Sequence, residues 1–370
     1  MIVRNLGLIS ALLFAVFTVS GCFDMLDGQA ANQGVSQNAM AGNSRNVVIA
    51  LPPGEQSGVM TKTGNFYKGT IVASDPTILR TSGGLRMYYT DLDVSTNRTV
   101  IATATSSDGV SWATEGTEHG INGLVLRGRE GAWDENIESV SVVKTGAGWT
   151  LYYSGYRDKG NPFKGFPSAL GMATSTDGRN FERVSDDPIM MPTKGWYDND
   201  AIYSSTVLYE NGTFYMIYVG HAYTNVSKVG SGGVFLLGAT STDGRNWTKH
   251  ETPISRPGQY GGWRAEGLAE PYLVKRDNGD YVLFFTGLKG EERTLGVGIG
   301  KSPLGPFKIG TKPILVPGAR GRPDEHQVLA PAAVIDGEQV RLWYLAADKR
   351  EFLSIGLAIG NLSEILETTN

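Results

Sequence analysis

A repeated nine-residue segment constrains the fold of this chain more than any other feature of its sequence. Three copies nearly match one another, at 104–112 (ATSSDGVSW), 173–181 (ATSTDGRNF) and 239–247 (ATSTDGRNW). Their aspartates, Asp108, Asp177 and Asp243, lie 69 and 66 residues apart. Asp-Gly between apolar runs is typical of a hairpin turn, because glycine readily adopts the positive φ that such turns need. A degenerate fourth copy lies at 300–307, and a fifth stops early at 359–362.

Each copy follows a pair of predicted strands. An aromatic segment lies upstream of every copy, at 86–90, 150–154, 214–218, 281–285 and 341–345. A shorter apolar segment precedes each of these, at 77–80, 141–144, 206–209, 272–275 and 332–335. Polar or glycine-bearing turns separate the two, as expected for hairpins. The unit is therefore strand, turn, strand, loop, strand, Asp-Gly turn, strand.

This unit occurs five times, and no helical pattern separates the copies. Four-stranded antiparallel units repeated around an axis form a β-propeller, which leaves few free strand edges. We therefore predict an all-β, five-bladed β-propeller of four-stranded antiparallel blades over residues 66–370. A two-sheet sandwich is the alternative, but a sandwich does not require so regular a repeat. Because the last copy lacks its outer strand, a strand within 47–51 is expected to complete it.

The N-terminal residues predict export and a lipid anchor. Arg4 precedes a largely apolar run at 6–19, and Val19-Ser20-Gly21 lead to Cys22, the single cysteine. A basic start, a short apolar stretch and small residues at its end are typical of a secretory signal, here 1–21. The last four residues resemble the lipobox of bacterial lipoproteins, which implies a diacylglycerol on Cys22 and membrane attachment. An ordinary signal peptide with an accidental cysteine is the alternative.

Residues 22–65 are rich in Gly, Ser, Asn and Gln, so we expect a flexible tether there. Phe23 follows the cysteine, where retention in an inner membrane usually needs Asp, so in a diderm cell we expect the outer membrane. The formal net charge is −4 and no Lys/Arg run is present, so no nucleic-acid partner is expected.

Two blade segments resemble a known family of enzymes. Residues 268–287 (LAEPYLVKRDNGDYVLFFTG) resemble the acid-bearing blade of family 43 glycoside hydrolases, and 74–79 (SDPTIL) resembles the strand that carries their base. The Gly-Trp linkers at 195–196 and 262–263 are similar to those of the wider five-bladed superfamily, which includes arabinanases, fructosidases and mannoside phosphorylases. The likeness covers about Phe66 to Leu362. It implies cleavage of a poly- or oligosaccharide by acid/base catalysis, without a required cofactor.

The family pattern transfers only in part. It implies a base at Asp75, an acid Glu on a later blade and an Asp that tunes the pKa of the acid. The family acid stands two residues before a proline, where this chain has Ala269, whereas Glu270 adjoins that proline directly. The tuning Asp would fall near Tyr203 or Ser204.

The repeat also places carboxylates by register. Aligning the inner strands on their X-Pro pairs matches Asp75 with Ser139, Ser204, Glu270 and Ala330. Equivalent positions in a ring face one axis, so these side chains should converge. Like charges at close range raise the pKa of one group, which suits a general acid. Four residues upstream, the aligned set is Glu135, Asp200, Glu266 and His326.

We assign candidate roles from this alignment. The catalytic candidates are Asp75 as base, Glu270 or Glu266 as acid, and Asp200. The candidates for substrate binding are Glu135, His326, Trp133, Trp196 and Trp263. Each has a structural alternative: Asp75 as a strand cap, the upstream acids as solvated linker residues, and the tryptophans as blade packing. His326 resembles the fifth-blade histidine near a central cation in some family members, so a structural Ca²⁺ near the axis is a further expectation.

Two classes of function remain open. The first is a glycosidase that acts on a carbohydrate outside the cytoplasm, and the second is a non-catalytic surface propeller that binds glycan or protein. The sequence contains no Gly-x-Ser-x-Gly, no Walker loop and no His-Glu-x-x-His. Asp75 and Glu270 favour the enzyme, whereas the shifted acid position and the missing tuning Asp favour the binding protein.

Overall fold

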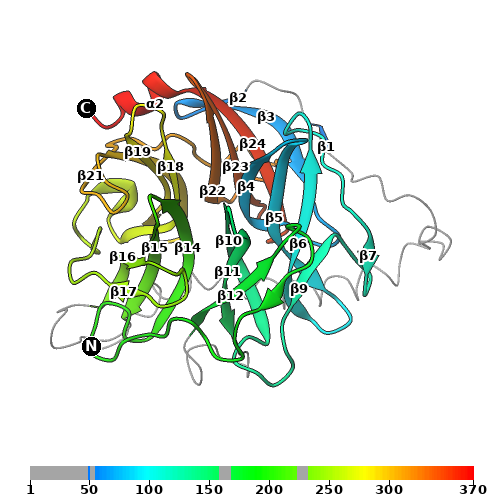
Figure 1. The fold of residues 1–370 in the computed structure, drawn as a ribbon. Helices are drawn as coiled ribbons and strands as arrows, with labels where there is room; N and C mark the ends of the chain where they lie inside the picture. Colours follow the sequence, from blue (N-terminus) through cyan, green and yellow to red (C-terminus); the bar gives the residue numbers. More distant parts are fainter. Residues whose placement is uncertain (1–48, 51–54, 158–167, 223–231) are drawn as a thin grey trace, which may run out of the picture.

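The computed structural model describes residues 49–50, 55–157, 168–222 and 232–370, and it confirms the five-bladed propeller (Figure 1). Blades one to four are antiparallel four-stranded sheets whose strands follow chain order from the axis outwards. Blade one contains β4 (Ser74–Thr81), β5 (Gly84–Asp93), β6 (Arg98–Ser106) and β9 (Leu124–Arg127). Blade two contains β10 (Asn136–Thr145), β11 (Gly148–Tyr156), β12 (Ala169–Ser175) and β13 (Glu182–Arg183).

The next two blades repeat this order. Blade three contains β14 (Ala201–Glu210), β15 (Thr213–Ala222), β16 (Gly233–Ser241) and β17 (Thr248–Lys249). Blade four contains β18 (Gly267–Lys275), β19 (Tyr281–Lys289), β20 (Glu292–Gly300) and β21 (Phe307–Ile309). The short elements outside the blades are a hairpin, β7 (Thr117–Glu118) with β8 (Ile121–Asn122), a 3₁₀ turn at Gly262–Arg264, and the helix α2 (Leu362–Glu367).

An N-terminal strand closes the ring. Blade five contains β22 (Gln327–Asp336), β23 (Gln339–Ala347) and β24 (Leu353–Asn361), and its outer strand is β3 (Met60–Tyr67). The expected strand within 47–51 is present as β1 (Ile49–Ala50) and belongs to the sheet of blade five. It pairs with β3, as does β2 (Glu55–Ser57), so the strand that completes the blade is β3 and not β1. The domain boundary predicted at 66 therefore falls inside β3. The strand escaped notice because its inward positions include Lys62 and Gly64 instead of apolar residues.

A buried ion pair fixes the closing strand. The Lys62 ammonium lies 2.7 Å from Asp324 Oδ2, and both side chains are fully buried. The Tyr344 hydroxyl of β23 donates to the same oxygen at 2.8 Å. Asp324 therefore joins the loop before blade five to the second and outer strands of that blade.

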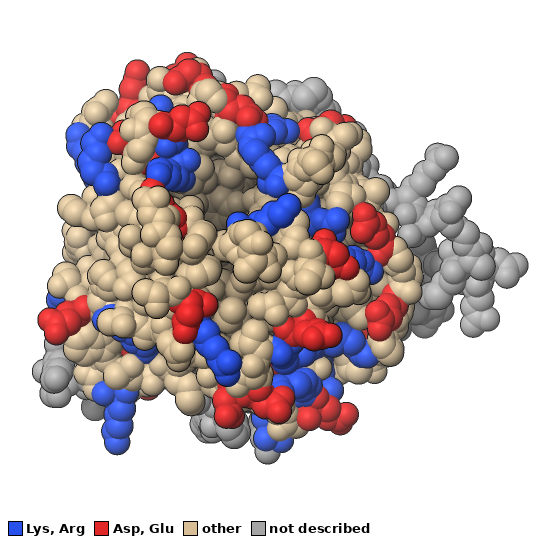
Figure 2. Space-filling view, viewed as in Figure 1, with Lys and Arg blue, Asp and Glu red and all other residues tan. Residues whose placement is uncertain are grey.

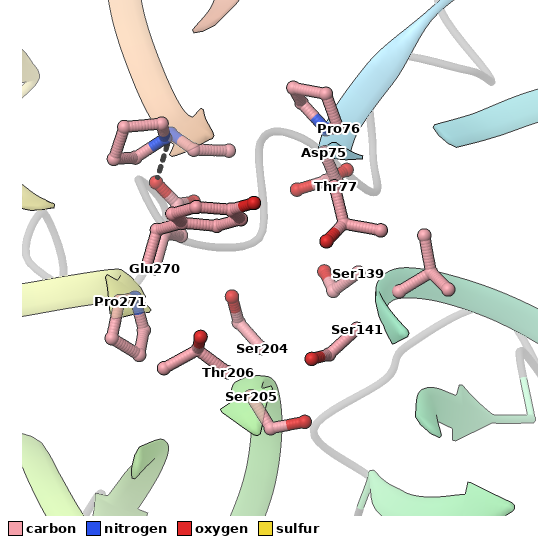
Figure 3. Close-up of a pocket in the computed structure, with 14 residues that line it drawn as sticks. Asp75, Pro76, Thr77, Ser139, Ser141, Ser204, Ser205, Thr206, Glu270 and Pro271 are labelled. Carbon is pink, nitrogen blue, oxygen red and sulfur yellow. Dashed lines mark hydrogen bonds between the residues drawn. The ribbon is translucent and has the colours of Figure 1, made fainter. Parts of the chain in front are cut away.

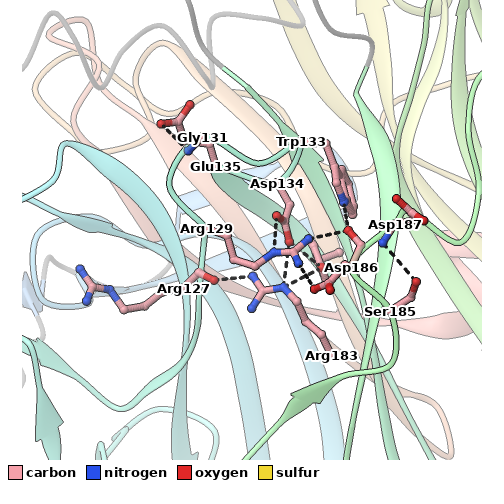
Figure 4. Close-up of polar contacts among 11 residues, drawn as sticks. Arg127, Arg129, Gly131, Trp133, Asp134, Glu135, Arg183, Ser185, Asp186 and Asp187 are labelled. Atoms are coloured by element: carbon pink, nitrogen blue, oxygen red, sulfur yellow. Dashed lines mark hydrogen bonds and ion pairs between the residues drawn. The ribbon is translucent and has the colours of Figure 1, made fainter.

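The same arrangement recurs in two other blades. In blade two, Asp134 accepts from the Tyr153 hydroxyl at 2.9 Å and pairs with Arg183 of the outer strand at 2.8 Å (Figure 4). In blade three, Asp198 accepts from Tyr218 at 3.1 Å and pairs with Lys249 of β17 at 2.5 Å. These buried aspartates hold the blades together, so their role is structural.

The surface and the N-terminus complete the description. Acidic and basic side chains are interspersed over the face shown in Figure 2, which is hollowed near its centre. Among the described residues, no helix combines the length and apolar composition needed to cross a bilayer. The predicted signal 1–21, the lipidation site Cys22 and most of the predicted tether lie outside the described residues.

Candidate active site

Five irregularities at the start of the inner strands define the site. Each inner strand carries a β-bulge there, at the position that the repeat aligns with Asp75. The five residues share an unusual positive φ of 44–52°: Asp75, Ser139, Ser204, Glu270 and Ala330. Non-glycine residues rarely adopt this conformation, so its fivefold recurrence marks a conserved turn of the backbone toward the axis. All five line one axial cavity.

This cavity has an empty volume of about 320 Å³, its open mouth included. Figure 3 shows Asp75 and Glu270 on different sides of it. Hydroxyl side chains supply much of the remaining lining: Thr77, Ser139, Ser141, Ser204, Ser205 and Thr206. Tyr272 reaches across from blade four, and its hydroxyl donates to the Ile78 carbonyl of blade one at 2.8 Å. The cavity is therefore polar and is bridged by one tyrosine.

A third carboxylate, Glu138, belongs to this group and was missed in the sequence. Burial is the main reason that the pKa of Glu138 lies well above its usual value, and the charges of Asp75 and Glu270 raise that pKa further. A hydrogen bond with Tyr156 opposes the shift. Glu138 immediately precedes the bulge residue Ser139 and is not one of the residues that line the cavity. The effect of Asp75 and Glu270 on its pKa nevertheless places it with these two carboxylates, although ordinary strand alternation would point it away from them.

The pKa of Asp75 lies near neutrality. Burial, followed by the charge of Glu270, raises the pKa of Asp75 to about 7. Hydrogen bonds from the Ser74 and Ser139 hydroxyls oppose this rise. A carboxyl group with such a pKa exchanges its proton near neutral pH, which suits acid/base catalysis.

Glu270 is the carboxylate best held as an anion. Burial raises the pKa of Glu270, but three groups oppose that rise. The Thr286 hydroxyl donates to Glu270 Oε2 at 2.5 Å, the Ala330 amide donates to the same oxygen at 2.9 Å, and the Arg293 guanidinium attracts its charge. Hydrogen bonds to a carboxylate favour its charged form. Because the charge of Glu270 raises the pKa of Asp75, and the charges of both raise the pKa of Glu138, we expect Glu270 to ionise first, Asp75 next and Glu138 last.

The other predicted acids do not line the cavity. Glu266 accepts a hydrogen bond from the Gly290 amide at 2.8 Å. Its negative charge acts to raise the pKa of Arg293, against the effect of burial. Asp200 accepts from Asn199 at 2.9 Å. Glu135 pairs with Arg98 at 2.7 Å. The roles assigned to these residues remain predictions.

The three linker tryptophans contact neighbouring aromatic rings. Trp133 stacks on Tyr153 at 6.0 Å with an interplanar angle of 10°, and Trp263 stacks on Phe285 at 5.9 Å and 1°. Trp196 meets Tyr197 edge-to-face at 5.2 Å. Glycines leave room for two of the indoles, because a Cβ at Gly155 or Gly287 would collide with the ring. These contacts favour blade packing over the predicted sugar stacking.

His326 has a structural contact, since its backbone amide donates to the Ala347 carbonyl at 3.0 Å. Within the described ranges, no group of three or more His, Cys, Asp or Glu side chains has the geometry of a metal site. The calcium ion expected near the axis, and a ligand role for His326, therefore stay predictions.

Solved structures of carbohydrate-active proteins share this architecture. A protein described as a glycoside hydrolase is 17% identical, with a TM-score of 0.63 over 88% of this chain and 96% of that chain. The β-1,2-mannobiose phosphorylase of Listeria innocua, solved with β-1,2-mannobiose, is 15% identical, with a TM-score of 0.63 over 86% and 98%. The chain has the five-bladed fold of the glycoside hydrolases and mannoside phosphorylases. A structure from the GH130 family of mannoside phosphorylases, which contains hydrolases that target β-1,2 mannosidic linkages in Candida mannan, gives a TM-score of 0.56 at 15% identity over 87% and 93%.

Curated relatives of this propeller match over a shorter stretch. The 1,2-β-oligomannan phosphorylase of Thermoanaerobacter sp. (strain X514) is 31% identical over 107 residues, which are 29% of this chain and 35% of that protein. The A type blood N-acetyl-α-D-galactosamine deacetylase of Flavonifractor plautii is 30% identical over 110 residues, 29% of this chain and 13% of that protein. The matched region thus spans about a third or less of these relatives. No protein-family profile matches the chain.

Proposed function

We propose that this propeller cleaves glycosidic bonds in a poly- or oligosaccharide at the axial carboxylates. One observation carries the proposal: Asp75, Glu138 and Glu270 come from three blades, the charge of Glu270 raises the pKa of Asp75, and the charges of both raise the pKa of Glu138. Carboxyl groups whose environments separate their pKa values are the usual pattern of acid/base pairs. The fold shared with glycoside hydrolases and mannoside phosphorylases adds support.

The order of ionisation assigns the roles. Glu138 retains its proton longest, so we propose it as the general acid in place of Glu270 or Glu266. Asp75, with a pKa of about 7, is the general base. Glu270 is proposed as the first of the three to ionise, and its charge raises the pKa of both other groups. It therefore does the tuning that the family pattern assigns to an Asp near Tyr203 or Ser204.

Hydrolysis then proceeds as one displacement. The Asp75 carboxylate takes a proton from a water molecule while the water oxygen bonds to the anomeric carbon. The bond from that carbon to the departing oxygen breaks, and Glu138 gives its proton to this oxygen. Asp75 ends protonated and Glu138 ionised, and exchange with solvent restores both.

A glycan panel tests the proposal. The purified protein is incubated with plant, fungal and bacterial glycans, with and without inorganic phosphate, and the products are separated by chromatography. We expect free reducing sugars that do not depend on phosphate. If the product is instead a sugar 1-phosphate that forms only when phosphate is present, the reaction is phosphorolysis and not hydrolysis. Phosphorolysis is the activity named for two of the similar proteins. Glycan binding without any product would favour the alternative of a non-catalytic surface propeller.

Glu138→Gln is expected to separate substrates by their leaving groups. The amide cannot protonate the departing oxygen, so cleavage of natural glycans should fall by about 10²-fold, the lower end for general acid catalysis. Aryl glycosides with a good leaving group need little protonation and should retain much of their rate. Comparison of kcat on the two substrate types measures the difference. Glu266→Gln is the matched control, since the charge of Glu266 is not among the causes that raise the pKa of Asp75 or Glu138. A leaving-group dependence in that variant instead would return the acid role to Glu266.

We also propose that the protein is attached to the cell envelope through lipid on Cys22. The lipobox-like Val19-Ser20-Gly21-Cys22 supports this proposal. Cys22→Ser removes the acceptor thiol and should move the protein from the membrane pellet to the soluble fraction after cell fractionation. Ser20→Ala, which keeps a small residue before the cysteine, should leave it in the pellet. Unchanged membrane partitioning of Cys22→Ser would argue against the anchor.

A further inference from the structure

A hydroxyl group links neighbouring blades at three of the five seams. It lies on the second strand of one blade and accepts a hydrogen bond from the bulge amide of the next. Thr90 accepts from the Ser139 amide at 3.3 Å, Ser154 accepts from Ser204 at 2.9 Å, and Thr286 accepts from Ala330 at 3.0 Å. All three hydroxyl-bearing residues are buried. The same hydrogen bond between adjacent blades therefore occurs three times in the propeller.

Blade four uses this hydroxyl differently. Thr286 Oγ1 also donates to Glu270 Oε2 at 2.5 Å, and the Ala330 amide is shared between the two oxygens. Because the threonine oxygen already accepts from that amide, its single hydrogen is directed to the carboxylate. One oxygen of Glu270 therefore receives two donors, from blade four and from blade five.

We propose that Thr286 is a positioning residue that holds Glu270 as an anion beside Asp75 and Glu138. The proposal rests on the function proposed above, because it gives the ionised Glu270 its purpose there. A fixed donor holds a charged group more tightly than mobile water does, and hydrogen bonds to carboxylates are stronger than neutral ones. The equivalent hydroxyls of the other two linked seams, on Ser154 and Thr90, supply internal controls. In the described structure, the side-chain hydrogen bonds of these two residues are only those that they accept from the bulge amides.

Titration of Glu270 tests the proposal directly. The side-chain carboxyl carbons of glutamate are labelled with ¹³C, the Glu270 resonance is assigned by its loss in Glu270→Gln, and its midpoint is followed by NMR. Thr286→Val keeps the shape but removes the donor, so the midpoint should rise by roughly one pH unit. Thr286→Ser should restore the wild-type midpoint. Should the valine variant fail to fold, Thr286→Ala serves instead.

Ser154→Ala is the matched control. It removes the equivalent hydroxyl from blade two, where no carboxylate accepts from it, and should leave the Glu270 midpoint unchanged. An equal shift in Ser154→Ala would mean that loosening any seam has this effect, and no shift in Thr286→Val or Thr286→Ala would mean that Glu270 does not depend on the hydroxyl. Either result overturns the proposal. Because the readout is a titration, it decides the role of Thr286 even if the glycan panel finds no turnover.

Discussion

Asp75→Asn is expected to slow glycan cleavage by about 10²–10⁴-fold, the range that general base catalysis supplies. The amide keeps the size of the side chain but cannot take a proton from water. The acidic limb of the wild-type profile of kcat/KM against pH should lie near pH 7, because the base works only when ionised and the pKa of Asp75 is about 7. That limb should vanish in the variant. Steady-state kinetics across pH measures both effects.

The fold should survive this change. Asn tolerates positive φ better than most residues, so it fits the bulge at φ 48°. Asp277→Asn makes the same chemical change in an exposed turn of blade four and should leave the kinetics unchanged. If Asp75→Asn retains wild-type rates at neutral pH, Asp75 is not the base and the proposed roles are wrong.

Lys62→Met is expected to lower the free energy of unfolding by about 3–5 kcal/mol, as is usual when one partner of a buried ion pair is removed. Asp324 would remain fully buried without the ammonium group that lies 2.7 Å away. Asp324 would still contact the Tyr344 hydroxyl and the Arg322 guanidinium, the latter at 3.4 Å. We therefore expect a loss of stability toward the lower end of this range. Urea unfolding followed by tryptophan fluorescence measures it.

Two further variants separate this effect from a general loss of charge. Lys62→Met combined with Asp324→Asn removes the stranded charge and should recover part of the loss. Lys275→Met breaks the partly exposed pair with Glu210 and should cost less than about 1 kcal/mol. Equal losses in Lys62→Met and Lys275→Met would show that closure by β3 does not depend on the buried pair.

The propeller could be predicted from the sequence because each copy of the repeated unit contains recognisable turns as well as strands. Asp-Gly turns 69 and 66 residues apart mark three of the blades. X-Pro pairs on three inner strands, with the equivalent positions in the other two, located the bulge position in every blade. The closing strand β3 was placed too early for a physical reason. Its inward position 62 carries a lysine that is buried only because Asp324, far away in the sequence, neutralises it. Hydrophobic alternation cannot reveal such a strand.

Glu138 was missed for a related reason. Strand alternation assigns neighbouring residues to opposite faces, so the residue before an axial position is expected to face away. A bulge breaks that rule by placing two residues against one on the partner strand. The register shift between Glu138 and Ser141 is such a break, and the sequence offers no local signal for it. The hydrogen bond from Thr286 to Glu270 could not be predicted from the sequence either, because it depends on the backbone amide of the next blade.

A crystal structure of Asp75→Asn with an uncleaved glycan from the panel tests the central claim most directly. We predict a glycosidic bond between the three blades, with its oxygen within hydrogen-bond reach of Glu138 and its anomeric carbon facing residue 75 across a space for one water molecule. The carboxyl groups of an inverting pair lie roughly 6.5–9.5 Å apart to make that space. A glycan bound elsewhere on the propeller, with no sugar at the axial cavity, would contradict it.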